Sequence, residues 1–469
     1  MKFMKLVALL LSIAMLFTVC ACSDKKEGPS KDPSELTSAD VDAETFKGLK
    51  FDTDPKLDFG GKTVKVARDT VPKEGISENY DRELAIKAAI EKKYNVVIEY
   101  VEYGTADKLK ENMVLNHMSS TAWADIVFAI SPNLLSLLTN DGIFRALDDY
   151  IDYSNERFAL TSSATRYVDG KHYSYYPTET DAGYFIYYNT DMLASNNCAD
   201  PRELYEEGKW NWEEFEKIVK ACTGEKNGKT IYGLAGSNLL DGMLASNGLT
   251  VLSADVDKKT VSCNLFTDAG KKALEFVRTL SYVDKAVDGT YGSHNGIETF
   301  NNSYAAMIVG PQYYGSHFVS TGIPYEMVPL PIGPDTDTYT NICQYCYCYG
   351  LSAHSEYDTE DLLQIAFELE RNDPAIEGTY REKNYEGKLE TFIEMYVDQS
   401  NHYHDDDQAQ FVYDFINEKK TVNKIEWLTD DIKKVITEKV YLPISKGEDV
   451  RSHLTSVEPV ITAALKEQF

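Results

Sequence analysis

The stretch "KTVKVAR" (Lys62–Arg68) decides the fold, because it opens a series of strands that alternate with helices. Its apolar and β-branched residues alternate with polar ones, as in a half-buried strand. "RELAIKAAIEKKY" (Arg82–Tyr94) follows as a helix with Leu84 and Ile86 on its apolar side. "NVVIEYVEY" (Asn95–Tyr103) then predicts a second strand. This alternation predicts a parallel sheet with helices on both faces.

The same alternation continues along the chain, with a third strand predicted at "ADIVFAI" (Ala124–Ile130). Capping residues followed by apolar positions at helical spacing mark the helices. Further helices are expected to begin at Thr105, Asn133, Asn211, Thr267 and Thr359. More than 400 of the 469 residues lie beyond the polar N-terminal region, which is too many for one core and predicts two domains.

The N-terminus has the pattern of an export signal. Lys2 and Lys5 precede an apolar run from Leu6 to Val19, which is too short to span a membrane comfortably. "VCAC" (Val19–Cys22) resembles the bacterial lipobox, and its register selects Cys22 as the lipidated residue. An ordinary secreted protein with a free cysteine near its end is the alternative. A dually acylated Cys22 would anchor the protein stably to a membrane.

The segment that follows the signal, from Ser23 to about Thr45, is rich in Lys, Asp, Glu, Ser and Pro. It has too little apolar surface to offset the entropy of ordering, so we expect a flexible tether. The whole chain carries a formal net charge of -28. A nucleic-acid partner is not expected, because such partners need a basic surface.

Seven stretches occur in an order that resembles a known family. They are "ADIVFAI" with "LTNDGIFRALDDYI" (138–151), "DGKHYSYYP" (169–177), "GYFIYYNTDML" (183–193), "GKWNWEEFEKIVKAC" (208–222), "NNSYAAMIVGPQYYG" (301–315) and "MVPLPIGP" (327–334). Together they resemble the extracellular solute-binding proteins of bacterial ABC importers, in particular those that take up sugars and oligosaccharides. The resemblance covers most of residues 64–355.

This resemblance implies the two-lobed periplasmic-binding-protein type II fold of the α/β class. Each lobe is expected to hold a mainly parallel sheet flanked by helices, and hinge strands are expected to join the lobes. The expected boundaries are 1–21 for the signal peptide, 22–55 for the lipid anchor and tether, 56–175 and 296–330 for lobe 1, and 176–295 and 331–469, with the C-terminal helices, for lobe 2.

Ligands of open parallel sheets bind beyond the carboxyl ends of the strands. Three loops occupy such positions, one after each of the strands "KTVKVAR", "ADIVFAI" and "AAMIVG", and we expect them to converge. The predicted ligand-binding residues are Asp69, Ser131, Asn133, Gln312, Tyr313 and Tyr314 from these loops, with Tyr184, Trp210 and Tyr345 in addition.

The composition suits a sugar ligand. A sugar ring offers apolar C–H faces to aromatic rings and hydroxyl groups to amides and carboxylates. The chain has 32 tyrosines, and several cluster in "YSYYP", "YFIYYN", "PQYYG" and "QYCYCYG". The alternative for any single tyrosine is packing on a half-buried strand.

Two groups of residues could suggest a metal site, but each fits an ordinary structural role better. In "CQYCYCYG" the cysteines do not share one face of a strand, since Cys343 falls on the tyrosine side. His402 and His404 precede three aspartates, Asp405–Asp407, whose position is typical of the start of a helix. We therefore expect neither a metal nor a cofactor, while the six cysteines after Cys22 leave the disulfide pairing open.

The function implied by the resemblance is a lipid-anchored, non-enzymatic receptor. It would capture a carbohydrate between its lobes and deliver it to the transmembrane subunits of an ABC permease. The protein is expected to be a monomer on the extracellular face of a bacterial cell membrane. A surface-anchored glycoside hydrolase, which needs two carboxylates across a cleft, and a surface lipoprotein without a transport role are the alternatives.

Overall fold

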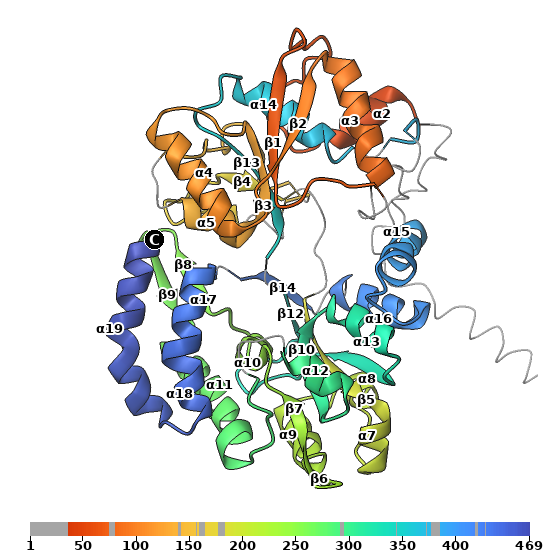
Figure 1. Ribbon diagram of the computed structural model, residues 1–469, viewed down its shortest axis with the longest axis vertical. Helices are drawn as coiled ribbons and strands as arrows, with labels where there is room; N and C mark the ends of the chain where they lie inside the picture. The colour runs from red at the N-terminus through yellow and green to blue at the C-terminus, as the bar shows by residue number, and fades with distance from the viewer. Residues whose placement is uncertain are drawn as a thin grey trace, which may run out of the picture.

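The structure is a computed structural model in which two lobes lie one above the other (Figure 1). It describes residues 36–74, 80–138, 142–155, 157–158, 165–176, 183–290, 295–343, 345–371, 373–376, 385–417, 421–426 and 428–469. The predicted signal peptide and Cys22 lie outside these residues. Among the described helices, none is both long and apolar enough to cross a membrane.

Lobe 1 is built on a five-stranded sheet of order β2-β1-β3-β13-β4. β1 (Thr63–Arg68) pairs in parallel with β2 (Val97–Glu102) and with the central strand, β3 (Ile126–Ile130). On the far side of β3, β13 (Tyr347–Leu351) runs antiparallel and also pairs with β4 (Ser174–Tyr175). The carboxyl ends of β1 and β3, where the first two predicted site loops begin, therefore lie at the same edge of the sheet.

Helices cover both faces of this sheet, as the alternation of strands and helices predicts. On one face α3 (Tyr80–Tyr94) and α14 (Thr359–Glu368) contribute apolar side chains to a core shared with β1. On the other face α4 (Ala106–Met118) and α5 (Ser131–Leu137) do the same. The prediction that Leu84 of α3 lies on the apolar side of its helix is wrong, because its side chain is exposed.

The predicted tether is wrong in its second half, because α2 (Ser38–Thr45) packs on lobe 1. Thr37 and Asp40 form a reciprocal capping box at its start, and Val41 is buried. The Asp42 carboxylate forms an ion pair with Arg371 of lobe 1, with 2.9 Å between Asp42 Oδ1 and Arg371 Nη1. Local composition predicts disorder here because it does not reveal these caps and distant charged partners.

Lobe 2 holds a second five-stranded sheet, of order β11-β5-β10-β7-β6. In it β10 (Ala305–Pro311) runs parallel to β7 (Lys229–Ala235) but antiparallel to β5 (Tyr184–Asn189). The edge strands β11 (Tyr325–Pro329) and β6 (Gly224–Lys226) also pair antiparallel with their neighbours. This sheet is therefore mixed rather than mainly parallel.

Helices and a hairpin surround this second sheet. The helices are α7 (Thr190–Ser195), α8 (Pro201–Glu206), α9 (Trp212–Ala221), α10 (Leu239–Ser246), α11 (Asp268–Arg278), α12 (Asn295–Asn301), α13 (Tyr314–Thr321), α15 (Tyr385–Ile393), α16 (Asp406–Asn417), α17 (Asp430–Ile436), α18 (Leu442–Ser445) and α19 (Val450–Gln468). The hairpin joins β8 (Leu252–Asp255) to β9 (Thr260–Cys263). Asn211 and Thr267 cap α9 and α11 as predicted, whereas the N-cap of α14 is Asp358 and not Thr359.

The predicted lobe assignment after residue 295 is wrong in two places. Residues 296–330 were expected in lobe 1, but β10 and β11 pair within the second sheet. Residues 331–469 were expected in lobe 2, but β13 and α14 belong to lobe 1. The apolar stretches of β10 and β13 are equally suited to either sheet, so their pattern does not decide which sheet they join.

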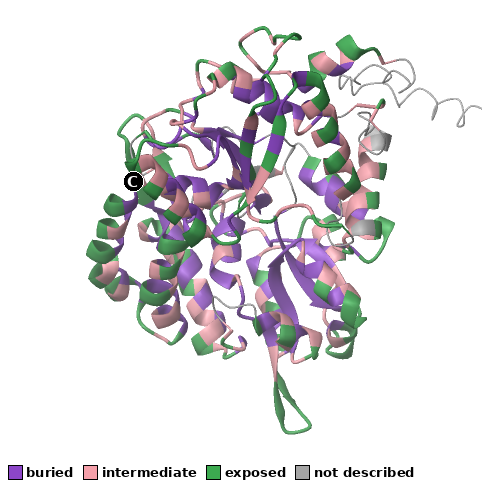
Figure 2. Cartoon of the chain, turned by 45° about the horizontal axis from the view of Figure 1, so that its top comes forward, coloured by how far each residue is buried: buried purple, intermediate pink, exposed green. Residues whose placement is uncertain are grey.

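The burial pattern shows why each lobe is stable. Figure 2 shows buried residues on the strands of both sheets, and exposed residues on the outer faces of the helices and at the β6–β7 hairpin. All seven residues of β10 are buried, as are all six of β5. The two lobes therefore have separate sheet cores, as a two-domain protein requires.

The segments between the lobes pack closely around Gly183. The short β12 (Thr340–Cys343) pairs in parallel with β14 (Val422–Ile425) beside the crossing from β4 to β5. The backbone N–H of Gly183 donates to Oδ1 of Asn341 at 2.7 Å. A Cβ at Gly183 would lie 2.0 Å from the backbone oxygen of Ile342. Only a glycine therefore fits at this crossing.

Replacing Gly183 by alanine is expected to lower the free energy of unfolding by about 1–3 kcal/mol, because the added methyl forces two backbone segments apart. Urea denaturation measures this change. A Cβ at Gly60 would meet nothing within 4 Å, but the φ of +62° makes Gly60 unsuitable as a control. Gly224, with open space and no positive φ, provides the control, and an equal loss at Gly183 and Gly224 would contradict the steric argument.

Candidate functional site

Aromatic and polar side chains meet at the carboxyl edge of the lobe 1 sheet. Asp69 directly follows β1, and its Oδ2 accepts a hydrogen bond of 3.4 Å from the Tyr347 hydroxyl. The Tyr347 ring stacks on Phe128 of β3, with ring centroids 5.2 Å apart and an interplanar angle of 18°. Tyr347 nevertheless stays 36% exposed. It therefore presents an aromatic surface to solvent while its hydroxyl is oriented by a carboxylate.

A second tyrosine, Tyr103, connects the loops that follow β1 and β3. Its hydroxyl donates to the backbone oxygen of Phe128 at 3.5 Å, and the Asn133 side chain at the start of α5 lies close to it. Burial, followed by the nearby Asp69 and Tyr347, raises the pKa of Tyr103. The phenol therefore stays neutral and can donate a hydrogen bond at physiological pH. The predicted residues Asp69 and Asn133 are thus brought together, with Tyr103 between them.

The same group extends through the inter-lobe segment toward lobe 2. Tyr345 is 37% exposed, and its ring lies edge-on to Tyr347 with centroids 6.1 Å apart. Tyr313 follows β10 of lobe 2, and burial, then the phenols of Tyr314 and Tyr345, raise its pKa. The tyrosine cluster is defined here as Asp69, Tyr103, Asn133, Tyr313, Tyr345 and Tyr347. It contains residues of both lobes and of the segment between them.

Tyr184 lies next to this cluster at the start of β5. Its hydroxyl is buried and has no hydrogen bond of standard geometry to any described residue. Burial, then the nearby Asp241, Tyr314 and Tyr313, raise its pKa. Asp241 itself has a raised pKa because it is buried, while Lys433 at 3.9 Å and a hydrogen bond from Tyr184 oppose the shift. The Tyr184 hydroxyl is therefore directed toward the Asp241 carboxyl, close to Tyr313.

Two predicted residues sit at the right strand ends but have other partners. The backbone N–H of Ser131 donates to the Cys346 oxygen at 2.7 Å, and its Oγ accepts from the Cys346 N–H at 3.2 Å. Gln312 directs its Oε1 to the Tyr403 hydroxyl at 2.9 Å. Both side chains are buried and join segments of the fold. Their assignment to the ligand-binding surface is therefore not supported by their placement.

Two predicted aromatic residues are core residues rather than surface residues. Trp210 is 1% exposed, and its Nε1–H donates to the Pro329 oxygen at 2.7 Å. Tyr314 is equally buried, packs on Phe318, and accepts a 3.0 Å hydrogen bond from Asn238. Each has its ring packed and its polar atom paired inside lobe 2, so their placement does not support the expectation that they face a ligand.

Tyr103 and Tyr347 were not among the predicted site residues, although the sequence contains signals for both. Tyr103 follows β2, so the rule applied to the ends of the first and third strands also selects it. Tyr347 alternates with Tyr345 in a stretch that was recognised as aromatic. No sequence signal points to Asp241, because it lies within α10 and comes near Tyr184 only through the fold.

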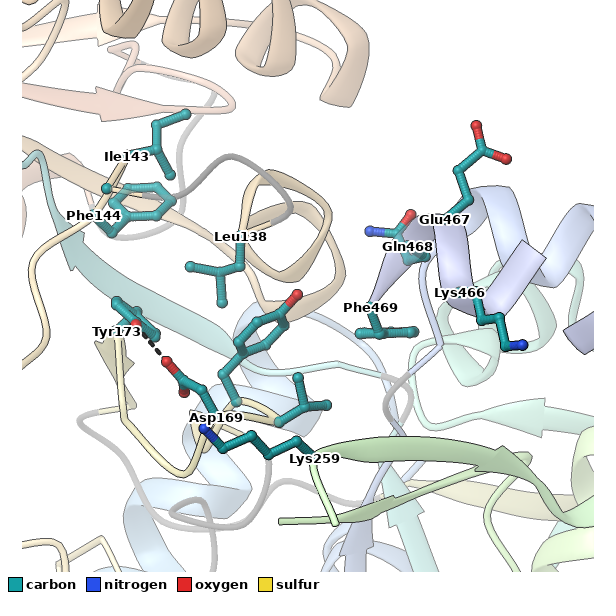
Figure 3. A pocket seen from close by; sticks show the side chains of 13 residues that line it. Leu138, Ile143, Phe144, Asp169, Tyr173, Lys259, Lys466, Glu467, Gln468 and Phe469 are labelled. Carbon is teal, nitrogen blue, oxygen red and sulfur yellow. Dashed lines mark hydrogen bonds between the residues drawn. The ribbon is translucent and has the colours of Figure 1, made fainter. Parts of the chain in front are cut away.

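A separate pocket of about 430 Å³ lies between the lobes, away from the tyrosine cluster. Leu138 and Phe144 from lobe 1 line one side, and Gln468 and Phe469 at the end of α19 line the other (Figure 3). None of the cluster residues lines this pocket. Connecting segments and the chain end form its walls, so the strand-end cluster is the better candidate for the main binding site.

The predicted helix start at the histidine-rich stretch is confirmed. Asp405 Oδ1 accepts a 2.9 Å hydrogen bond from the Gln408 N–H at the start of α16. His404 contacts two carboxylates, with Nε2 at 3.1 Å from Glu326 and Nδ1 at 2.8 Å from Asp405. Within the described ranges, no group of three or more His, Cys, Asp or Glu side chains is arranged to hold a metal ion.

The two histidines of this stretch have pKa values shifted in opposite directions. The hydrogen bond to Glu326 raises the pKa of His404, whereas burial lowers the pKa of His402 to about 4. Protonated His404 therefore stabilises the fold. Its contribution is complete below pH 6.5, the ordinary value, and is lost as the pH rises through the raised pKa. His402 acts in the opposite sense, because its protonation below pH 6.5 favours unfolding.

Replacing His404 by glutamine is expected to reduce stability at pH 6 by about 1 kcal/mol or less, and to leave it nearly unchanged at pH 9. Urea denaturation of both proteins at each pH measures the difference, and the contribution of His402 cancels because both proteins contain it. An equal loss at the two pH values would show that His404 acts by packing and not by charge.

Comparison with known proteins gives a family match. A profile described as bacterial extracellular solute-binding protein matches residues 85–379, which is more than half of the chain. No curated protein matches the sequence.

Solved structures share the two-lobed type II fold at low identity. A cyclo/maltodextrin-binding protein complexed with maltotetraose has a TM-score of 0.60 and 15% identity, covering 88% of this chain and 98% of its own. An ABC substrate-binding protein from Listeria monocytogenes in complex with cycloalternan has a TM-score of 0.56 and 15% identity, and the match covers 86% of this chain and 99% of that protein. UgpB from Mycobacterium tuberculosis in complex with glycerophosphocholine has a TM-score of 0.53 and 14% identity, and the match covers 87% of this chain and 99% of that protein. At this identity the likeness shows the fold.

Proposed function

The chain belongs to the bacterial extracellular solute-binding protein family, and from this premise we propose that it captures a carbohydrate between its lobes for an ABC importer. The members of this family and the solved structures of the same fold are binding proteins of transporters and not enzymes. We therefore propose that this protein binds its ligand reversibly and releases it chemically unchanged.

The observation that carries the proposal is the tyrosine cluster. Tyr345 and Tyr347 expose aromatic rings at an angle of 89° to one another, beside the Asp69 carboxylate and the Asn133 amide. Aromatic faces suit the C–H surface of a sugar ring, and a carboxylate with an amide suits its hydroxyl groups. Tyr313 and the nearby Tyr184 add phenol groups from the other lobe.

The position of the cluster also supports hinge closure on the ligand. A ligand that touches Tyr347 of lobe 1 and Tyr313 of lobe 2 gains contacts only when the lobes are close together. An exposed ion pair already joins the lobes at 3.6 Å, between Lys110 of α4 and Asp431 of α17. Such a pair is weak, worth at most about 1 kcal/mol, so the ligand would supply most of the closing energy.

Thermal unfolding with a ligand panel tests the proposal. The panel contains malto-, cello- and xylo-oligosaccharides and their monosaccharides, with glycerophosphocholine as a probe of another solute class. A carbohydrate at 100 times its Kd is expected to add about 2.7 kcal/mol to the stability, which is a clear shift in Tm. A shift with glycerophosphocholine alone would overturn the carbohydrate assignment, and sustained release of reducing sugar would favour a glycoside hydrolase.

We also propose that residues 1–21 are a signal peptide and that Cys22 anchors the protein by a lipid to the outer face of the cell membrane. The lipobox-like "VCAC" supports this location, and the family is extracellular. The transmembrane subunits of an ABC permease would be the partner, and the receptor would act as a monomer. Mass spectrometry of the N-terminal peptide tests the anchor, and replacing Cys22 by alanine is expected to release the protein from membranes.

A further inference from the structure

Two cysteines of lobe 2 lie in contact although they are 24 residues apart in the chain. The Sγ atoms of Cys198 and Cys222 are separated by 3.7 Å, without a bond between them. Cys198 follows α7, where its N–H donates to the Leu193 oxygen at 3.0 Å. Cys222 ends α9, where its N–H donates to the Ile218 oxygen at 3.0 Å. Both backbones are thus held by helix ends, which keeps the sulfur atoms close together.

We propose that Cys198 and Cys222 form a disulfide when the protein meets an extracytoplasmic disulfide oxidant. A disulfide needs its sulfur atoms about 2.05 Å apart, and the present 3.7 Å is the contact distance of two thiols that already face each other. Exported proteins meet such oxidants, whereas cytosolic proteins are kept reduced. The source of oxidant in the cell is the one part of this inference that depends on the proposed location.

The exposure of the two cysteines sets the order of the reaction. Cys198 is partly exposed and lies beside the exposed Asn197 and Ala199, whereas Cys222 is buried, and its burial raises the pKa of its thiol. The thiolate of Cys198 attacks one sulfur of the oxidant disulfide and displaces a thiolate. The thiolate of Cys222 then attacks Cys198 Sγ and displaces the second thiolate. The two cysteines lose two electrons and two protons, and the oxidant becomes two thiols.

A second pair of sulfur atoms provides a contrast within the same molecule. Cys346 and Cys348 lie 3.4 Å apart, but both are buried, and they are only two residues apart. In extended chain such residues have Cα atoms about 6.6 Å apart, near the upper limit for a disulfide. Their bond would also close too short a loop to restrict the unfolded chain much. The structure therefore favours oxidation of the Cys198–Cys222 pair over the Cys346–Cys348 pair.

Peptide mapping after incubation with oxidised glutathione tests the inference. The protein is unfolded in iodoacetamide without reductant, digested and analysed by mass spectrometry. A linked peptide pair containing Cys198 and Cys222 is expected, with Cys263, Cys343, Cys346 and Cys348 alkylated. Alkylation of both Cys198 and Cys222, a glutathione adduct at Cys198 without the cross-link, or a cross-link between other cysteines would overturn the inference.

Thermal unfolding of cysteine variants tests the Cys198–Cys222 disulfide independently of the peptide mapping. Dithiothreitol is expected to lower the Tm of the oxidised wild-type protein by roughly 5 °C, because the bond closes a long loop. It should leave the Tm of Cys198→Ser and Cys222→Ser unchanged, while Cys263→Ser, which keeps the proposed pair intact, should respond like the wild type. Equal responses of Cys198→Ser and Cys263→Ser would contradict the inference. Carbohydrate binding should not change, so this test is independent of the proposed function.

Discussion

Replacing Trp210 by alanine is expected to lower the free energy of unfolding by about 3–5 kcal/mol, because it leaves a large cavity in lobe 2. The indole packs edge-on against Phe215, with ring centroids 5.9 Å apart, inside the main core of that lobe. Its loss also leaves the backbone oxygen of Pro329, in the edge strand β11, without its hydrogen bond. Urea denaturation followed by circular dichroism measures the change.

Two controls separate the parts of this effect. Trp210→Phe keeps most of the packing but loses the N–H, and should cost about 1–3 kcal/mol. Tyr282→Ala removes an aromatic side chain that is half exposed, and should change stability by about 0.5 kcal/mol or less. If Trp210→Ala left stability intact and instead abolished ligand binding, Trp210 would be a ligand contact after all.

Replacing Tyr347 by alanine is expected to weaken carbohydrate binding by about 10- to 100-fold. An aromatic side chain buried by a ligand contributes about 1.5–3 kcal/mol, and each 1.4 kcal/mol is a factor of ten in Kd. Tyr347 is poised for this role, because Phe128 supports one face of its ring while part of the side chain is exposed. Isothermal titration with the best carbohydrate of the panel measures the Kd.

Graded variants distinguish the ring from its hydroxyl. Tyr347→Phe keeps the aromatic face and loses only a 3.4 Å hydrogen bond to Asp69, so its Kd should rise by less than about tenfold. Tyr282→Ala should bind like the wild type and controls for loss of a tyrosine outside the cluster. Unchanged affinity in Tyr347→Ala would remove the tyrosine cluster as the binding site while leaving the family assignment in place.

Much of the candidate site could be predicted because strand ends are visible in the sequence. Asp69 and Asn133 were found by their positions after β1 and β3, and the structure connects them through Tyr103. Tyr313 was found in the same way after β10. Position after a strand does not fix where a side chain points, however. Gln312 precedes Tyr313 directly, yet its side chain is turned to Tyr403, 91 residues further along the chain.

The sequence by itself determined the local structure and the family. Apolar periodicity and capping residues act over a few residues, so they located β1, α3, α9 and α11 correctly. An ordered series of weak landmarks was enough for the solute-binding fold. These features depend on interactions between neighbours in the chain, which any sequence displays directly.

Only the tertiary structure decided which sheet each returning strand joins and which aromatic rings are buried. Strands β10 and β13 are both apolar, and their lobes follow from pairing with β5 and β3, far away in the chain. Trp210 and Tyr347 are both aromatic residues near polar loops, yet one fills a core and the other is partly exposed. The physical reason is that burial and strand pairing depend on interactions between segments that are distant in the sequence. The type and spacing of neighbouring residues do not reveal these interactions.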